Sequence, residues 1–123
     1  MGEKERAALT EPMFYVLMSF LHRDMCGIEI AGSVERRTGG RLRLGPGTLY
    51  TLLGKFQDEG LIEETQTEGR KRTYRLTDRG RTAYLDELAR LRACVRDGEN
   101  ALHQTEEEPE DRPAGLVPLP EGV

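Results

Sequence analysis

Hydrophobic and polar positions alternate with several periods along the 123-residue chain, and each period predicts a type of element. Apolar residues are dense from Met13 onward, after Thr10, which can cap a helix, and Pro12, which the first turn tolerates. We expect this helix to continue to about Arg23 and to be covered on more than one side. The next elements expected are a helix over about 26–38, with Ile28, Ala31 and Val34 on one stripe and Gly39-Gly40 at its end, and an edge strand over 41–44. A helix from Pro46 to Gly60, strands over 61–67 and 72–76, and a long helix over 77–104 with Thr77 as its cap follow.

The expected third helix has two contrasting faces. One face is apolar and is expected to enter the core, because its residues follow the spacing i, i+3, i+4, i+7. These residues are Leu49, Leu52, Leu53 and Phe56. The opposite face is small and polar, so it can approach the floor of a DNA major groove closely, and the free N–H groups at the helix start can hold a phosphate. It consists of Gly47, Thr51, Gly54 and Asp58, flanked by Thr48, Lys55, Tyr50 and Gln57. An ordinary amphipathic surface helix is the alternative interpretation of the same pattern.

Apolar residues in the last helix repeat with alternating spacings of four and three, which is typical of a short coiled-coil seam. The residues are Tyr84, Leu88, Leu91 and Val95, and Leu102 falls on the same repeat. An exposed seam of this kind would lower solubility, so we expect it to form the interface of a homodimer together with excess apolar surface on the first helix. The space between two such helices would suit an apolar small-molecule effector, which the sequence does not identify.

The order of these elements predicts a mostly α fold with a small β-hairpin (α+β): a winged helix-turn-helix followed by a long dimerisation helix. Four segments are expected, namely a flexible N-terminus at 1–9, the DNA-binding domain at 10–76, the dimerisation helix at 77–104 and a disordered tail at 105–123. The tail is acidic and contains four prolines. Such a composition cannot bury enough apolar surface to fold alone.

Charge is unevenly distributed along the chain. The formal net charge is −4, yet residues 70–81 contain six basic side chains against Asp78 alone, a net charge of +5. Residues 98–123 contain seven acidic side chains against Arg112 alone, a net charge of −6. A concentrated basic stretch is expected of an element that contacts phosphates, and a solvated surface is the alternative. Arg70, Lys71 and Arg72 stand at the expected hairpin tip, from which they can reach a minor groove or the DNA backbone.

Other classes of function are disfavoured by the motifs and spacings. No nucleophile elbow, P-loop or dinucleotide fingerprint is present, so we expect no enzyme activity. The two cysteines and two histidines lack the paired spacing of a zinc site, so neither a metal nor another cofactor is expected. The longest apolar stretch, residues 13–21, is too short to span a membrane, and no export signal is recognised. We therefore expect a cytoplasmic protein.

Two motifs resemble the signatures of the PadR family of bacterial transcriptional regulators. The first is Gly45-Pro46-Gly47-Thr48-Leu49-Tyr50 with Leu53 and Gly60-Leu61-Ile62, and the second is Arg72-Thr73-Tyr74-Arg75-Leu76-Thr77 with Gly80. The resemblance covers about residues 12–97. It implies a homodimeric winged-helix protein, usually a repressor, that binds an imperfect palindrome in double-stranded DNA and is often released by a small molecule. It places Thr48, Tyr50, Thr51 and Lys55 on the DNA-reading helix. It places Arg70, Lys71 and Arg72 on the wing. We also expect Gly47, at the start of the DNA-reading helix, to contact DNA.

The sequence departs from the family pattern in three places. The second helix begins with Cys26-Gly27-Ile28 where relatives often carry aromatic residues. The third helix has Thr51 and Gly54 where relatives often have a proline and a basic residue, which shifts more of the expected DNA affinity onto the wing. Some relatives hold flat ligands between aromatic residues of the long helix. That mode is not expected here, because Leu91 lies in that region and the chain has no tryptophan.

Two alternatives to simple DNA binding arise from the same observations. The acidic tail and the few base-reading side chains of the third helix also suit a winged-helix dimer that serves as a protein-interaction module without specific DNA binding. In a combined version, the tail competes with DNA for the basic wing, most strongly at low salt. The operator, the regulated genes and the choice between repressor and activator are not determined by the sequence.

Overall fold

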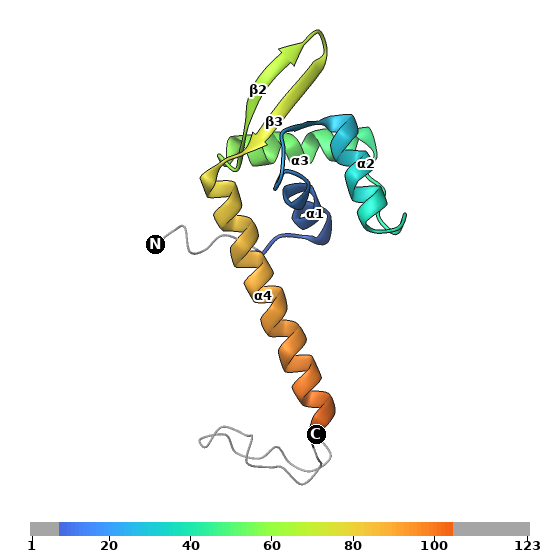
Figure 1. The fold of residues 1–123 in the computed structure, drawn as a ribbon, viewed down its shortest axis with the longest axis vertical. Helices are drawn as coiled ribbons and strands as arrows, with labels where there is room; N and C mark the ends of the chain where they lie inside the picture. Colours follow the sequence, from blue (N-terminus) through green and yellow to red (C-terminus); the bar gives the residue numbers. More distant parts are fainter. Residues whose placement is uncertain (1–7, 105–123) are drawn as a thin grey trace. The chain divides into compact units, whose positions relative to one another are not determined.

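The computed structural model describes residues 8–104, so the tail expected at 105–123 and most of the segment expected at 1–9 lie outside the described residues. The elements in Figure 1 are α1 (Glu11–Ser19), β1 (Met25–Cys26), α2 (Gly27–Arg37), α3 (Pro46–Asp58), β2 (Ile62–Glu68), β3 (Lys71–Leu76) and α4 (Asp78–His103). The chain forms two compact units, residues 1–90 and 91–123, and α4 begins in the first and ends in the second. This mostly helical arrangement with a small antiparallel sheet confirms the predicted winged-helix fold.

The core of the first unit is made by the apolar faces of α1, α2 and α3 and by the strands. Its largest fully buried side chains are Phe56, Leu17, Ile30, Leu53, Leu61, Ile62, Val16 and Val34. Each such side chain contributes about 1.5–3 kcal/mol when it leaves water. Leu49, Leu53 and Phe56 of α3 are buried and Leu52 is half-buried, which confirms the predicted orientation of this helix. The small polar face of α3 therefore points to solvent.

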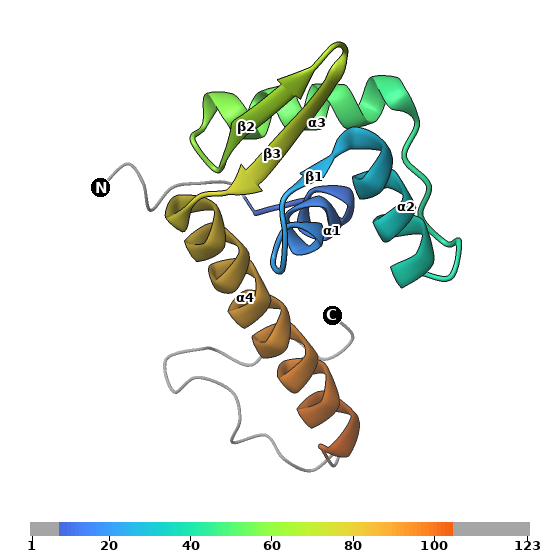
Figure 2. The ribbon, with the colours of Figure 1, turned by 45° about the horizontal axis from the view of Figure 1, so that its top comes forward.

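The sheet has the strand order β1-β3-β2, and both pairings are antiparallel (Figure 2). β1 pairs Met25 with Tyr74 and Cys26 with Thr73, while β2 and β3 form the hairpin that we call the wing. The prediction of a strand over 41–44 was wrong, because residues 42–45 have no regular secondary structure and β1 supplies the third strand.

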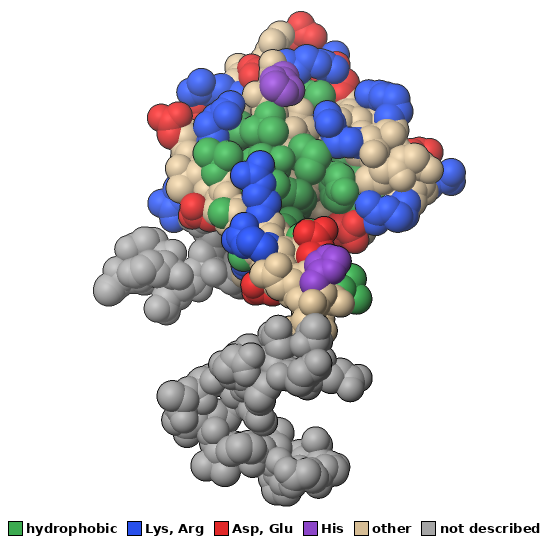
Figure 3. Space-filling view, turned by 60° about the horizontal axis from the view of Figure 1, so that its bottom comes forward, with side chains coloured by type: hydrophobic (Ala, Val, Ile, Leu, Met, Phe, Trp, Pro, Cys, Tyr) green, Lys and Arg blue, Asp and Glu red, His purple; other side chains and the backbone are tan. Residues whose placement is uncertain are grey.

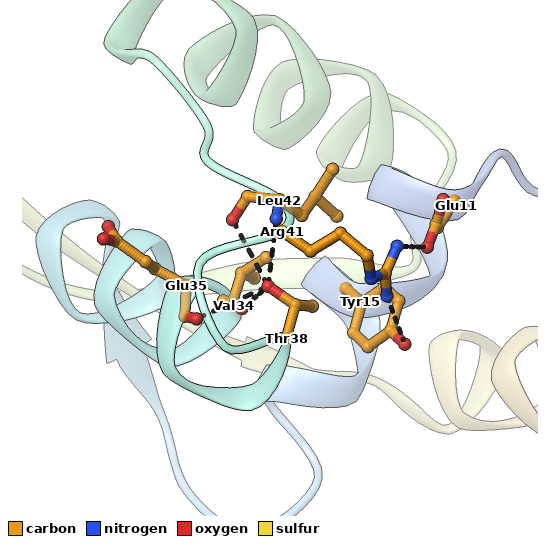
Figure 4. A network of polar contacts seen from close by, with 7 residues as sticks. All are labelled: Glu11, Tyr15, Val34, Glu35, Thr38, Arg41 and Leu42. Atoms are coloured by element: carbon orange, nitrogen blue, oxygen red, sulfur yellow. Dashed lines mark hydrogen bonds and ion pairs between the residues drawn. The ribbon is translucent and has the colours of Figure 1, made fainter.

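Side-chain contacts, rather than pairing with a strand, hold the segment around residues 38–42 in position (Figure 4). Thr38 Oγ1 accepts a hydrogen bond from the Leu42 N–H at 3.0 Å. Arg41 forms an ion pair with Glu11 and donates a hydrogen bond to Tyr15 Oη at 3.3 Å. Because these contacts satisfy the segment locally, it does not need a strand partner.

Helix α1 ends at Ser19, earlier than the predicted end near Arg23. The N–H of Phe20 donates to the Leu17 carbonyl at 3.1 Å, and the next N–H makes the same three-residue bond, so the last turn tightens. Phe20 is buried. The chain therefore turns at this residue and reaches the sheet at Met25.

Thr77 joins the wing to α4. Its Oγ1 donates to the Gly60 carbonyl at 2.7 Å and accepts from the Gly80 N–H at 3.0 Å, which is the capping role expected for Thr77. The N–H of Thr77 donates to the Leu61 carbonyl at 3.0 Å. These three bonds fix the first turn of α4 against the residues that connect α3 to β2.

Glu87 is a buried carboxylate on α4. It accepts hydrogen bonds from Arg90 Nε at 3.1 Å and from the Leu9 N–H at 3.4 Å. The Arg90 hydrogen bond is the largest cause that lowers the pKa of Glu87 below its ordinary value of 4.5, and burial opposes it. Since the pKa is lower in the folded state, the ionised carboxylate stabilises the fold above pH 4.5, and this contribution is lost as the pH falls through the folded value.

A Glu87→Gln substitution is therefore expected to lower the free energy of unfolding at pH 7 by about 1.5–3 kcal/mol, the value of a hydrogen bond to a charged group. The difference from the wild type should shrink as the pH falls below 4.5, because protonated Glu87 is neutral like glutamine. Urea unfolding of both proteins between pH 3.5 and 7 measures this difference. A difference that stays constant over that range would show that the charge of Glu87 has no role.

Candidate nucleic-acid interface

The face of α3 that points to solvent is small and open. All five residues predicted to bind DNA on this helix are exposed, namely Gly47, Thr48, Tyr50, Thr51 and Lys55. A Cβ atom added at Gly47 or Gly54 would meet no atom within 4 Å, so the backbone itself is accessible there. Lys55 Nζ lies 3.0 Å from a carboxylate oxygen of Glu59, so its charge is partly compensated within the helix. This face can approach a base-pair edge closely but offers little positive charge.

The N-terminus of α3 offers backbone donors. Gly45 is the N-cap residue and Pro46 occupies the first turn, as predicted. The first N–H that bonds within the helix belongs to Leu49, which donates to the Gly45 carbonyl at 2.9 Å. The N–H groups of Gly47 and Thr48 precede that bond, so they suit an external anion such as a phosphate.

The register of the wing separates its basic side chains. Successive side chains of a strand point to opposite faces, so Arg72 lies on the same face as the buried Tyr74 and Arg75 lies on the other face. Arg75 Nε donates to a carboxylate oxygen of Glu63 at 2.6 Å, and this ion pair compensates its charge. The sequence pattern does not distinguish Arg75 from the other basic residues of the hairpin. The pairing of β2 with β3 does, because it places Arg75 beside Glu63.

A groove of about 940 Å³ lies between α3, the start of α2 and the wing, and we call it the wing groove. It is lined by Cys26, Gly27, Ile28, Glu29, Tyr50, Leu53, Gly54, Gln57, Thr67, Gly69, Arg70, Lys71, Arg72 and Tyr74. All three basic residues predicted at the hairpin tip thus line it, and within residues 8–104 none of the three forms an ion pair. Gly69 at the turn has a φ of 62°, a conformation that favours glycine.

Glu29 is the one acidic residue that lines the wing groove. It accepts a hydrogen bond from the Cys26 N–H at 2.9 Å, which is the largest cause that lowers the pKa of Glu29, and it pairs with Arg23 at 3.4 Å. Its negative charge is therefore compensated at the start of α2 by the Cys26 N–H and by Arg23. The wing groove keeps a positive character from its three wing residues.

The sequence interpretation missed Ile28 as part of this site. Of the predicted stripe on α2, Val34 is fully buried, but Ile28 is 84% exposed because Ile30 and Ser33 complete the buried face instead. Tyr50 on α3 is 63% exposed and lines the same groove. The helical period locates a face only to within one residue when a helix is as short as α2, which explains the error.

The residues predicted at a dimer interface have different environments. Tyr84 is buried and stacks on Phe14 with a ring-centroid distance of 4.9 Å, so most of its surface is already covered within its own chain. Leu88 and Leu91 are half-buried, and Val95 is exposed. Figure 3 shows hydrophobic side chains gathered over a broad area of one face and bordered by basic side chains. Because Tyr84 is buried and Val95 is exposed, Tyr84 offers less accessible surface to a dimer partner than Val95 does.

Residues 8–104 contain neither a membrane-spanning helix nor a cluster of metal-binding side chains. No helix in this part of the chain is long and apolar enough to cross a membrane. The same residues contain no group of three or more His, Cys, Asp or Glu side chains placed to hold a metal ion.

Comparison with known proteins agrees with this geometry. Residues 16–86 match the family described as transcriptional regulator PadR-like. A transcriptional regulator from Clostridium thermocellum superposes with a TM-score of 0.65 at 21% identity, over 72% of this chain and 87% of that one. A PadR family regulator from Clostridium difficile gives a TM-score of 0.62 at 22% identity, over 76% and 99% of the two chains.

A structure with bound nucleic acid is also similar to this chain. Bacillus subtilis PadR in complex with operator DNA has a TM-score of 0.55 at 25% identity, over 62% of this chain and 45% of that one. No curated protein matched the chain. The family match covers more than half of the sequence, and it includes α3 and the wing. The chain therefore belongs to the PadR-like family of DNA-binding transcriptional regulators, which is not a family of enzymes.

Proposed function

We propose that this protein is a cytoplasmic, homodimeric repressor that binds an imperfect DNA palindrome and is released from it by a small molecule. The observation that supports this most strongly is the wing groove, whose lining beside α3 includes three basic residues that form no ion pair within residues 8–104. That the similar Bacillus subtilis PadR was solved with its operator supports the same function.

In the proposed complex, α3 enters the major groove and the wing reaches the neighbouring minor groove. One phosphodiester strand separates these two grooves of a duplex, so that strand would lie along the wing groove. Gly47, Thr48 and Thr51 present N–H, hydroxyl and methyl groups to the major groove, while Arg70 and Arg72 contact phosphates along the minor groove. Two protomers would address half-sites about one helical turn apart.

Fluorescence anisotropy tests this function. The purified protein is titrated with labelled DNA from upstream of its own gene and with a shuffled control, at two salt concentrations. Preference for the native sequence that persists at the higher salt supports a specific regulator, because non-specific binding rests on phosphate contacts that salt weakens. Absence of binding to any duplex, including those from a random-sequence pool, would favour the protein-interaction module instead. Raised transcription of the bound promoter in a deletion strain distinguishes a repressor from an activator.

The proposed dimer uses Leu88, Leu91 and Val95 of α4, with a smaller contribution from Tyr84. Met13 and Met18 of α1 are also only half-buried, so apolar surface remains in the first unit. An apolar effector held between the long helices of two protomers could release the DNA if its binding altered the spacing of the recognition helices. This effector would bind apart from the wing groove.

A double substitution Leu91→Glu with Val95→Glu is expected to give a monomer in sedimentation velocity, because it places like charges in an apolar seam. DNA affinity should fall at least tenfold, since each half-site would then bind independently. Arg96→Glu, next to the seam in sequence but outside its repeat, should leave a dimer. A double variant that still sediments as a dimer would show that the interface lies elsewhere.

A further inference from the structure

Two large apolar side chains, Ile28 and Tyr50, lie exposed at the wing groove. They come from different helices and are brought together by the backbone of Gly27. A Cβ atom added at Gly27 would lie 3.6 Å from Tyr50 Cε1, so the tyrosine ring packs beside the residue that precedes Ile28. The two side chains therefore form a small apolar surface within a groove that also carries three basic residues, and we call it the Ile28–Tyr50 pair.

The fold does not account for this exposure. Ile30 and Val34 are the fully buried aliphatic side chains of α2, and Leu49 and Leu53 are buried on the inner face of α3. A single exposed apolar side chain is ordinary on a protein surface. Two of them in one concave site, beside basic groups that suit phosphates, are better explained by an apolar feature of the molecule that binds there.

The exposed face of α3 offers few groups for reading bases by hydrogen bonds. Its exposed residues include two glycines and two threonines, Lys55 is paired with Glu59, and Gln57 is the amide that lines the groove. Arginine and asparagine are absent from α3, so Lys55 and Gln57 are its side chains of the types that make bidentate contacts to guanine and adenine. Apolar contact with the C5-methyl group of thymine is the form of direct readout that needs no such residue.

We propose that the Ile28–Tyr50 pair recognises thymine in the operator through its C5-methyl group. This inference rests on the DNA-binding function proposed above and names the base that the wing groove selects. The methyl group leaves water against the two apolar side chains, while Arg70 and Arg72 hold neighbouring phosphates. Among the four standard bases, only thymine carries this methyl group in the major groove.

Uracil replaces thymine without changing its hydrogen-bonding edges, so it isolates the methyl group. A duplex that the protein selects from a random-sequence pool is prepared once with thymine and once with uracil, and the two are compared by anisotropy. The wild type is expected to bind the uracil duplex about fourfold more weakly for each contacted base, the factor for burying one methyl-sized group. If each of the two half-sites has one such contact, the wild type is expected to bind the uracil duplex about sixteenfold more weakly than the thymine duplex.

Substitution of Ile28 tests whether the Ile28–Tyr50 pair causes the difference in affinity between the thymine and uracil duplexes. Ile28→Ala should bind the thymine duplex more weakly than the wild type does and reduce the thymine-to-uracil affinity ratio toward one. Because Ile28 is exposed, this variant should keep the wild-type melting temperature. Tyr50→Phe retains the ring and should retain the ratio. Arg70→Ala is the matched control, which should weaken binding to both duplexes and leave the ratio unchanged.

The outcomes separate this inference from the function on which it depends. An unchanged ratio in Ile28→Ala would overturn the inference, as would equal wild-type affinity for the two duplexes, and either result leaves DNA binding intact. Failure to select any duplex would overturn DNA binding and the inference with it. Loss of affinity in Ile28→Ala by the same factor for both duplexes would assign Ile28 to the sugar–phosphate backbone and also overturn the inference.

Discussion

Replacement of Gly80 by alanine is expected to destabilise the protein by about 3 kcal/mol, the upper end of the usual cost of overpacking. A Cβ atom at this position would lie 2.1 Å from the Leu61 carbonyl oxygen and 2.7 Å from Leu76 Cδ1. The leucine side chain can move, but the carbonyl oxygen belongs to backbone that Thr77 already holds through its N–H. Relief of the contact therefore requires the first turn of α4 to shift away from the residues that connect α3 to β2.

Urea unfolding followed by circular dichroism measures this effect, and Gly98→Ala provides the matched control. Gly98 also lies inside α4, but an added Cβ atom there meets no atom within 4 Å. Alanine favours a helix interior over glycine by about 0.5–1 kcal/mol, so Gly98→Ala should stabilise the protein slightly. If Gly80→Ala stayed within 0.5 kcal/mol of the wild type, roughly the size of an ordinary surface effect, the close approach at Leu61 would not matter.

The elements with a strict period or a clear cap could be predicted from the sequence. The apolar spacing in α3 identified its buried face, and Thr10, Pro46 and Thr77 marked helix starts that the structure confirms. β1 could not be predicted, because a two-residue strand has no period of its own. Its place is set by pairing with β3, which lies almost fifty residues later in the chain.

The positive charge of the candidate site could be predicted from the sequence, but the directions of its side chains could not. The cluster of basic residues at the hairpin tip identified the wing, whereas the register shows that Arg75 of the same hairpin does not line the groove. A bulge between Glu64 and Gln66 shifts the pairing there, so a residue count along β2 alone would assign its later side chains to the wrong face. The exposure of Ile28 depends in the same way on how α2 rotates against the core.

Simultaneous replacement of Arg70, Lys71 and Arg72 by alanine is expected to weaken DNA binding of the dimer by about a thousandfold or more at low salt. Each lost phosphate contact reduces the slope of log K against log salt by about 0.9, so the slope should fall by about 2 to 3 for each protomer. Anisotropy titrations at several salt concentrations, on specific and shuffled duplexes, measure both quantities. Because phosphate contacts carry no sequence information, affinity for both duplexes should fall.

Arg75→Ala distinguishes the geometry of the wing groove from net charge alone. Arg75 belongs to the same strand and carries the same charge as Arg72, but it faces away from the groove and is paired with Glu63. Its replacement should therefore leave the salt slope within about 0.3 of the wild type, whereas Arg72→Ala should lower it by about 0.9 for each protomer. Equal losses in the two variants would contradict the wing groove as the phosphate site. They would mean that DNA responds to the summed charge of the hairpin, in which case the register of the strands has no bearing on binding.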